Sequence, residues 1–309
     1  MVKSNLPLIV SLASLSQSFA DQGAPSLPPG FHNDLDDISV SAGHFHTCAI
    51  ESRPGVEFGG GIKCWGENAH GQATAPSGIF VQVSAGYMHS CAVGIDEQVK
   101  CWGKDFGVVP EGLFSQVSAG EFHSCGVMKD GSVKCWGANH WGEGAPNGGD
   151  FVQVSCGNGS TCGLRGNGLV ECWGRNDKGQ LDAPEGKVFK QISSSLNFHA
   201  CGLEYESGDV SCWGWNHREQ SESRTGPFVQ VSAGSTSTCA IKEDQTVECW
   251  GAHQPIPHES LLDDQDMIYD QISLGVDHAC GVTADGELHC WKKGSDFGAH
   301  QVPLGFAVA

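Results

Sequence analysis

Residues 123–137 read HSCGVMKDGSVKCWG and place two cysteines, Cys125 and Cys135, on either side of an Asp-Gly pair. Apolar and polar residues alternate before and after this pair, which is the pattern of two β-strands joined by a tight turn. Opposed residues of an antiparallel hairpin bring their Cβ atoms within disulfide reach. Opposing these two cysteines requires an odd-numbered loop, so we predict a three-residue loop with Gly131 in the left-handed conformation.

The first strand of this hairpin belongs to a segment that occurs seven times. The copies read ISVSAGHFHTCAI (38–50), FVQVSAGYMHSCAV (80–93), FSQVSAGEFHSCGV (114–127), FVQVSCGNGSTCGL (151–164), FKQISSSLNFHACGL (189–203), FVQVSAGSTSTCAI (228–241) and YDQISLGVDHACGV (269–282). The serine of the VS or IS pair recurs after 43, 34, 37, 38, 39 and 41 residues. A period in this range indicates a solenoid or a propeller.

The repeats consist of strands and turns. FVQVS alternates with period two, and Gly and Pro interrupt every unit, so long helices have no room. A β-helix would need shorter turns of more uniform length. We therefore predict an all-β fold, a seven-bladed β-propeller with one disulfide per blade, and we expect the usual four strands in each blade.

The N-terminus is typical of an exported protein. Residues 1–20 contain Lys3, a short apolar run and SFA before Asp21, which is the pattern of a cleaved signal peptide. We predict a signal peptide at 1–20, an N-terminal linker at 21–37 and the propeller at 38–309. The apolar run is too short to span a bilayer, so we expect a secreted, extracellular protein without membrane insertion.

The charge balance excludes several partners. The chain has 17 basic against 36 acidic residues, a formal net charge of −19. Nucleic acids and anionic membranes need clustered Lys and Arg, so neither is an expected partner. We expect a soluble monomer.

Fourteen of the 15 cysteines form seven regular pairs. The pairs are Cys48/Cys64, Cys91/Cys101, Cys125/Cys135, Cys162/Cys172, Cys201/Cys212, Cys239/Cys249 and Cys280/Cys290. Zinc sites prefer two to four residues between paired cysteines, and five of these pairs have nine. We predict disulfides and no metal. Cys156, the fifteenth, is either a buried free thiol or part of an intermolecular bridge.

A tryptophan follows the second cysteine of every pair. These residues are Trp65, Trp102, Trp136, Trp173, Trp213, Trp250 and Trp291. Each points to the opposite face of its strand from the cysteine. One large ring per blade favours packing between neighbouring blades over the stacking of a ligand.

The pattern SAGxxHSCAV…DGxVxCWGxN…GQ resembles the regulator of chromosome condensation repeat, in the seven-bladed superfamily that includes β-lactamase inhibitor protein II. The resemblance covers residues 38–309 and implies a propeller whose loops bind another protein. It does not imply nucleotide exchange on a nuclear GTPase, because this chain is acidic, exported and rich in cystine. Repeat 5 has SSS for SAG, repeat 6 lacks the GQ loop and repeat 7 has CWKKG for CWG.

Five repeats carry a histidine two residues before the first cysteine: His46, His89, His123, His199 and His278. A ring of imidazoles could hold a metal, but hydrogen bonding to nearby backbone explains the same pattern, and Ser160 and Ser237 replace the histidine in repeats 4 and 6. Asn158 begins the sequence Asn-Gly-Ser and is a candidate glycosylation site.

No catalytic motif is present: the chain lacks a nucleophile elbow, HExxH, a phosphate loop and a calcium loop. We therefore expect a secreted protein-binding propeller, an interaction module and possible inhibitor of an extracellular enzyme, with no cofactor and no catalytic residue. The alternative is a carbohydrate-binding or carbohydrate-active propeller. A glycosidase would need two carboxylates in the central channel.

In a meander, the AGxxH and WGxN loops fall at one end of the blades and the Asp-Gly hairpins at the other, which is acidic. The first end collects His70, Tyr87, Phe106, Phe122, His140, Trp141, Phe198, Trp215, His217 and Phe297. Solvent-facing aromatic residues indicate a protein-binding surface. The candidate contacts are Trp141, Trp215, Phe106, His140, His217, Tyr87, Phe122 and Phe198, led by the two tryptophans. The alternative for Tyr87, Phe122 and Phe198 is that they plug the channel.

The C-terminal segment GFAVA resembles another copy of the FVQVS strand. We expect it to pair beside a strand of the terminal blade and so to join the first and last repeats.

Overall fold

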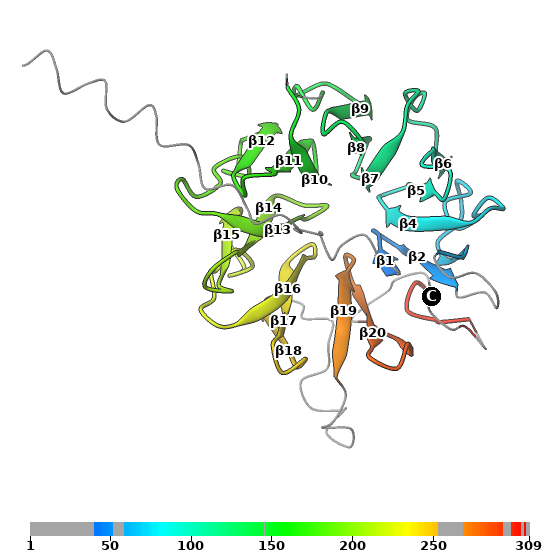
Figure 1. The fold of residues 1–309 in the computed structure, drawn as a ribbon. Coiled ribbons are helices and arrows are strands. Elements are labelled where there is room, and N and C mark those ends of the chain that lie inside the picture. Colours follow the sequence, from blue (N-terminus) through cyan, green and yellow to red (C-terminus); the bar gives the residue numbers. More distant parts are fainter. Residues whose placement is uncertain are drawn as a thin grey trace, which may run out of the picture.

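The computed structural model describes residues 40–51, 59–144, 146, 148–252, 268–292, 298–303 and 306. The predicted signal peptide and linker lie outside these residues. Twenty-one strands form seven three-stranded antiparallel sheets, arranged as blades around a central axis (Figure 1). The described residues include no helix long and apolar enough to cross a membrane.

Each blade consists of an inner, a middle and an outer strand in chain order. The inner strands are β1 (Val40–Ala42), β4 (Phe80–Ala85), β7 (Phe114–Ala119), β10 (Phe151–Cys156), β13 (Phe189–Ser194), β16 (Phe228–Ala233) and β19 (Tyr269–Leu274). The middle strands are β2 (His46–Glu51), β5 (His89–Gly94), β8 (His123–Met128), β11 (Ser160–Arg165), β14 (His199–Glu204), β17 (Ser237–Lys242) and β20 (His278–Thr283). The outer strands are β3 (Gly61–Gly66), β6 (Val99–Gly103), β9 (Val133–Gly137), β12 (Val170–Gly174), β15 (Val210–Gly214), β18 (Val247–Gly251) and β21 (Leu288–Lys292).

The seven-bladed all-β prediction is confirmed, but the expected fourth strand is wrong for the described residues. Irregular segments with many Gly and Pro follow the outer strands instead. The nearest approach to a fourth strand is a single bridge between Val210 and Arg224 in the fifth blade. Pro removes the backbone donor that a regular strand would need, so these segments do not extend the sheet.

The hairpin of residues 123–137 has the predicted geometry. Cys125 lies opposite Cys135, and Met128 N–H donates to the carbonyl of Ser132 at 2.7 Å. This closes a three-residue loop in which Gly131 has φ of 79°. Because only Gly adopts this conformation at no steric cost, the Asp-Gly pair sets the register that opposes the cysteines.

All seven predicted disulfides form within blades, between opposed residues of the middle and outer strands, with Cα atoms 4.0–4.1 Å apart. The bonded pairs are Cys48–Cys64, Cys91–Cys101, Cys125–Cys135, Cys162–Cys172, Cys201–Cys212, Cys239–Cys249 and Cys280–Cys290. Each disulfide therefore fastens the outer strand of a blade to its middle strand.

The two cysteines of a pair differ in burial. The first, on the middle strand, is buried in every blade. The second, on the outer strand, is only partly buried, and this holds for Cys64, Cys101, Cys135, Cys172, Cys212, Cys249 and Cys290. The disulfides thus lie at the outer margin of the blade cores, where the apolar packing that would otherwise hold the outer strand is thinnest.

The tryptophans pack between blades, as predicted. Trp250 of the sixth blade shares a buried cluster with Leu203 and Val210 of the fifth. The indole N–H of Trp102 donates to the carbonyl of Gln72, in the segment that arrives from the preceding blade, at 2.9 Å. A ring in this position fills the space between two neighbouring sheets, and its N–H also holds the connecting segment by a hydrogen bond.

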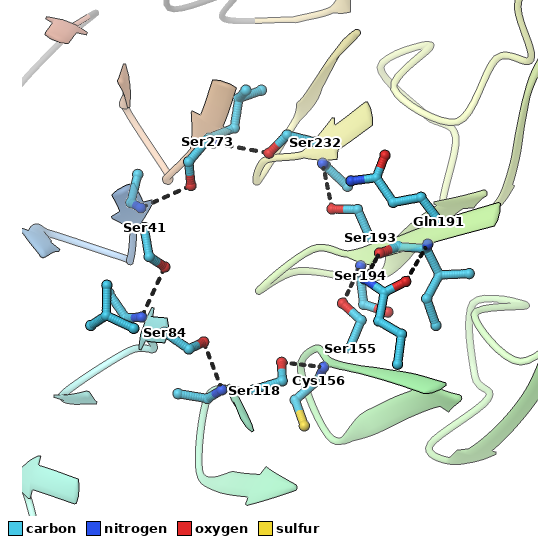
Figure 2. A pocket seen from close by; sticks show the side chains of 18 of the residues that line it. Ser41, Ser84, Ser118, Ser155, Cys156, Gln191, Ser193, Ser194, Ser232 and Ser273 are labelled. Atoms are coloured by element: carbon cyan, nitrogen blue, oxygen red, sulfur yellow. Dashed lines mark hydrogen bonds between the residues drawn. The ribbon is translucent and has the colours of Figure 1, made fainter. Parts of the chain in front are cut away.

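A closed ring of hydrogen bonds joins the inner strands across the channel wall. In each blade the repeat serine accepts a bond of 2.8–3.0 Å from a backbone N–H of the next blade (Figure 2). Ser41 accepts from Ala85, Ser84 from Ala119, Ser118 from Cys156, Ser155 from Ser194, Ser193 from Ala233, Ser232 from Leu274, and Ser273 from Ala42.

The repeat glutamine adds a second set of bonds, which joins six of the seven pairs of neighbouring blades because the first repeat has Ser39 at this position. Gln82 accepts from the N–H of Val117 and donates to its carbonyl, both at 2.9 Å, so one side chain replaces two ladder hydrogen bonds. Gln116 does the same with Val154. An inner strand has no neighbouring strand on its channel side. These side chains therefore supply hydrogen bonds to the backbone N–H and C=O groups along that edge.

The C-terminal segment joins the last repeat to the first, although not as a strand in the part that is described. Thr47 of the first blade donates to the carbonyl of Ala299 at 2.8 Å. Phe306 packs against Trp65, with ring centroids 5.9 Å apart. Residues 307–309 lie outside the described residues, so the predicted strand pairing is not tested there.

The serine ring predicts the effect of removing one hydroxyl. Ser118→Ala leaves the buried backbone N–H of Cys156 without its acceptor, so we expect the free energy of unfolding to fall by about 1–3 kcal/mol. Urea denaturation of the disulfide-intact protein measures this. Ser77→Ala, in an exposed segment, is the control. Equal stability of the two variants would contradict a structural role for the ring.

The disulfide scheme predicts a peptide map. Non-reducing digestion should link each first cysteine to the cysteine that precedes the next tryptophan, and a link between different repeats would contradict the scheme. Cys156 is buried and has no disulfide partner, so it should react with iodoacetamide only after unfolding.

Candidate functional site

Two sets of segments meet at one end of the propeller. The turns between inner and middle strands lie beside the segments that follow the outer strands, as Lys104 N–H donating to the carbonyl of Met88 at 2.9 Å demonstrates. Trp215 N–H donates to the carbonyl of Phe198 in the same way, at 2.8 Å. We call this end the loop face. The arrangement confirms the predicted sorting of the loops between the two ends.

A first aromatic cluster on the loop face consists of His44, Tyr87, Phe106 and Phe122, from the first three blades. The ring centroids of Tyr87 and Phe122 are 5.9 Å apart, as are those of Phe106 and Phe122. His44 lies 4.3 Å from Tyr87, and burial lowers the pKa of this histidine to about 4. His44 is therefore neutral at ordinary pH, and a charged group also contacts these rings, since Nζ of Lys104 lies 5.5 Å from the centroid of Phe106.

A second aromatic cluster consists of Trp141, Arg175, Phe198, Trp215 and His217. The guanidinium carbon of Arg175 lies 5.1 Å from the ring centroid of Trp141 and 4.7 Å from that of Phe198. Trp215 stacks on His217 with centroids 3.8 Å apart, and it contacts Phe198 edge-on at 5.9 Å. Arginine thus joins side chains from loops that are far apart in the sequence.

All eight predicted contact residues lie on the loop face, and seven of them enter these clusters. Trp141 is 58% exposed and Phe122 is 41% exposed. His140 is exposed but makes no ring contact that ties it to either cluster. Phe297 lies outside the described residues. Sequence reasoning missed Arg175, although it occupies the position directly after CWG where Trp215 stands in the following repeat.

The central channel is narrow and polar. Serine and glutamine side chains of the inner strands line it together with small apolar residues, and the cavity is about 140 Å³. Pockets for small-molecule ligands usually measure about 300–1,000 Å³. Tyr87, Phe122 and Phe198 are not among the lining residues.

The repeat histidines form hydrogen bonds between neighbouring blades. In each case Nε2 is hydrogen-bonded at 2.7–2.9 Å to a hydroxyl of the next blade. The pairs are His46–Ser90, His89–Ser124, His123–Thr161, His199–Thr238 and His278–Thr47. The hydrogen-bonding interpretation was right, but the partner is a side chain of the next blade and not nearby backbone.

The sequence contains a signal for this pairing. Where serine replaces the histidine, at Ser160 and Ser237, the next repeat has alanine in place of the hydroxyl, at Ala200 and Ala279. Histidine and hydroxyl are thus present or absent together. Burial lowers the pKa of His46 and His199 to about 3 and that of His89 and His123 to about 4. All four are neutral at ordinary pH.

Cys156 is a buried free thiol, in the place where other repeats have a small residue. Its sulfur lies within 4.8 Å of a ring nitrogen of His123 and of the sulfur of Cys125. Cys125 is bonded to Cys135 and offers no thiolate, so these three residues do not make a thiolate metal site. Burial raises the pKa of Cys156 to about 12. A thiol so buried does not reach a second chain.

Acidic side chains at the opposite end serve the hairpin turns. The Asp130 carboxylate accepts from the N–H of Ser132 at 2.9 Å, and Asp244 accepts from Thr246 at 3.0 Å. Hydrogen bonds from the hydroxyls of Ser132 and Thr246, and next these backbone bonds, lower the pKa of both aspartates. Asn158 lies on the loop face with a half-buried side chain.

Comparison with known proteins identifies the repeats. Residues 114–143, 151–180 and 269–291 match the model of the Regulator of chromosome condensation (RCC1) repeat. A 64-residue segment is 36% identical to the serine/threonine-protein kinase-like protein CCR4 of Arabidopsis thaliana and covers 20% of this chain. That match spans 8% of the length of the kinase-like protein.

Two solved structures have the same architecture. The ectodomain of the Physcomitrella patens receptor kinase CR4 superposes with a TM-score of 0.69 and 25% identity, over 83% of this chain and 73% of that one. The CRINKLY WD40 ectodomain of the Arabidopsis thaliana receptor kinase ACR4 gives 0.67 and 24%, over 83% and 97%. The second likeness concerns the fold alone.

The buried histidines predict a loss of stability in mild acid. Each has a lower pKa in the folded than in the unfolded state, where about 6.5 is usual, so the unfolded chain binds more protons below that pH. Stability should fall as pH decreases from about 6.5 toward 4, by about 1 kcal/mol per pH unit for each histidine.

Urea denaturation at pH 7, 6 and 5 measures this slope. His199→Gln should reduce it by about the contribution of one proton. His70→Gln, at an exposed position, should leave the slope of the wild-type protein unchanged. An unchanged slope in His199→Gln would contradict the assignment.

Proposed function

Because three of the seven repeats match the regulator of chromosome condensation repeat and the chain folds as seven disulfide-linked blades, we propose that it is a protein-interaction module that binds its partner with the loop face. One observation carries the proposal. Two aromatic clusters lie on one end of the ring, and Trp141 and Phe122 expose about half of their surface there. Tryptophan, tyrosine and arginine dominate the binding energy of protein interfaces.

Extracellular binding is the second part of the proposal. Seven disulfides persist in an oxidising compartment, and the CR4 structure is a receptor-kinase ectodomain. A secreted monomer that blocks an extracellular enzyme fits these properties and the resemblance to β-lactamase inhibitor protein II. The net charge of −19 favours a protein partner over a nucleic acid.

A non-enzymatic role is favoured over a carbohydrate-active one. A glycosidase places two carboxylates beside its substrate. The described residues that line the channel include no Asp or Glu, and the cavity is too small for a sugar chain. One face of Trp215 is covered by His217, which leaves less of that indole for stacking on a sugar.

Replacing both loop-face tryptophans, the exposed Trp141 and the half-buried Trp215, tests the proposal. We expect Trp141→Ala with Trp215→Ala to weaken partner binding by roughly 30-fold or more, because central aromatic contacts contribute about 2 kcal/mol or more each. The measurement is capture from the native extracellular fluid followed by quantitative mass spectrometry, with affinity then determined for each captured protein.

The matched control is Glu206→Ala with Glu243→Ala, two exposed positions at the hairpin end. It should capture the same proteins as the wild-type chain. If the tryptophan variant is folded, by its thermal unfolding, and still binds with wild-type affinity, the loop face is not the binding surface.

A further inference from the structure

One carboxylate lies between the two aromatic clusters. Glu121 occupies the position directly after the SAG turn, where the other repeats have His44, Tyr87, Asn158, Leu196, Ser235 and Val276. It is the only acidic residue at this position of the repeat.

The backbone fixes Glu121 at the boundary between two blades. Its N–H donates to the carbonyl of Gly157 in the fourth blade at 3.2 Å. The next residue, Phe122, belongs to the first aromatic cluster. Arg175 of the second cluster lies close enough to lower the pKa of Glu121 by its charge. The side chain therefore stands between the two clusters.

The carboxylate is under-satisfied. Its Oε2 atom is buried without a hydrogen-bond partner. Arg175 forms its ion pair with Asp177: a terminal guanidinium nitrogen donates to Oδ2 at 2.8 Å, while Nε lies 2.7 Å from Oδ1 but makes no hydrogen bond of its own. Burial raises the pKa of Glu121 more than Arg175 lowers it. A carboxylate oxygen shielded from water and left without a donor is destabilising until a donor is supplied.

We propose that Glu121, flanked by the two aromatic clusters, is the subsite for a positively charged side chain, lysine or arginine, of the protein partner. The inference rests on the proposed function and adds the chemistry of the contact. A cation supplies the N–H donors that Oε2 lacks. Its flanks can lie against the aromatic rings on either side, where the ring faces attract positive charge.

Charge complementarity supports a basic occupant. Glu121 and Asp177 both interact with Arg175, so two carboxylates share one guanidinium there. The whole chain carries −19, so a basic partner is also attracted from a distance. An anionic group would meet an unpaired carboxylate, and a divalent metal would find one carboxylate where it needs several ligands.

Small neutral and cationic probes test the subsite on the full chain. The protein is labelled with 5-fluorotryptophan, and the resonance of Trp141 is assigned with Trp141→Phe. N-acetyl-arginine amide is titrated against N-acetyl-citrulline amide, which has the same length and hydrogen-bonding shape but no charge. We expect a saturable shift of the Trp141 resonance with the arginine probe at millimolar concentration, and binding at least about tenfold weaker with citrulline.

Glu121→Gln keeps the size of the side chain and removes its charge. It should therefore lower the affinity of the protein for the arginine probe at least about tenfold. The control is Glu67→Gln, on the loop face of the first blade, which should bind the probe as the wild-type chain does. Unchanged resonances of the seven blade tryptophans establish that each variant is folded.

Three results would overturn the subsite: no saturable shift up to about 50 mM arginine probe, equal binding of citrulline, or undiminished binding by Glu121→Gln. These failures are distinct from failure of the proposed function. A protein partner that still depends on Trp141 and Trp215 would then bind the loop face without a cation at Glu121.

Discussion

The constraint on which this structure depends is the unpaired edge of each inner strand. Seven sheets meet around the axis, and none continues into the next, so each inner strand has backbone groups without a ladder partner on one side. Ser118 and its six equivalents each accept a hydrogen bond from one backbone N–H. The Gln82 side-chain amide bonds both the N–H and the carbonyl of Val117, as the backbone of a neighbouring strand would. The serine of the SAG turn, present in all seven repeats, and the preceding glutamine, present in six, therefore serve the ring, and their recurrence does not indicate a ligand.

Further from the axis, three more kinds of contact hold the blades. The histidine binds a hydroxyl of the next blade, the tryptophan fills the wedge beyond it, and the disulfide fastens the outer strand. These contacts are independent of one another, because repeats 4 and 6 omit the histidine and keep the rest. A repeat can therefore lose one kind of contact without loss of the fold, as Ser160 and Ala200 demonstrate together.

The sequence predicted what is local or strictly periodic. Asp130-Gly131 sets the register of one hairpin, and that register opposes Cys125 and Cys135. The other six disulfides followed from the recurrence of a cysteine pair in every repeat. The histidine partners were missed because His123 and Thr161 are 38 residues apart and meet only when blades pack side by side. Arg175 was missed for the same reason: its neighbours in the second cluster come from other loops, and a search for aromatic residues does not include arginine. The fourth strand was expected from propellers in general, and the part of the chain that the structure describes forms three strands in each blade.

The position after the SAG turn explains how one end of so regular a ring can become specific. His44, Tyr87 and Glu121 are all held by the backbone, since each N–H donates to the glycine carbonyl of the following blade at 3.0–3.2 Å. The fold thus needs nothing from the side chain, and the seven repeats carry seven different residues there. At the hairpin end, by contrast, Asp130 and Asp244 are committed to turn hydrogen bonds. Residues on the loop face can therefore change without loss of a hydrogen bond that the fold needs. The aromatic residues and the under-satisfied carboxylate of Glu121 lie on this face.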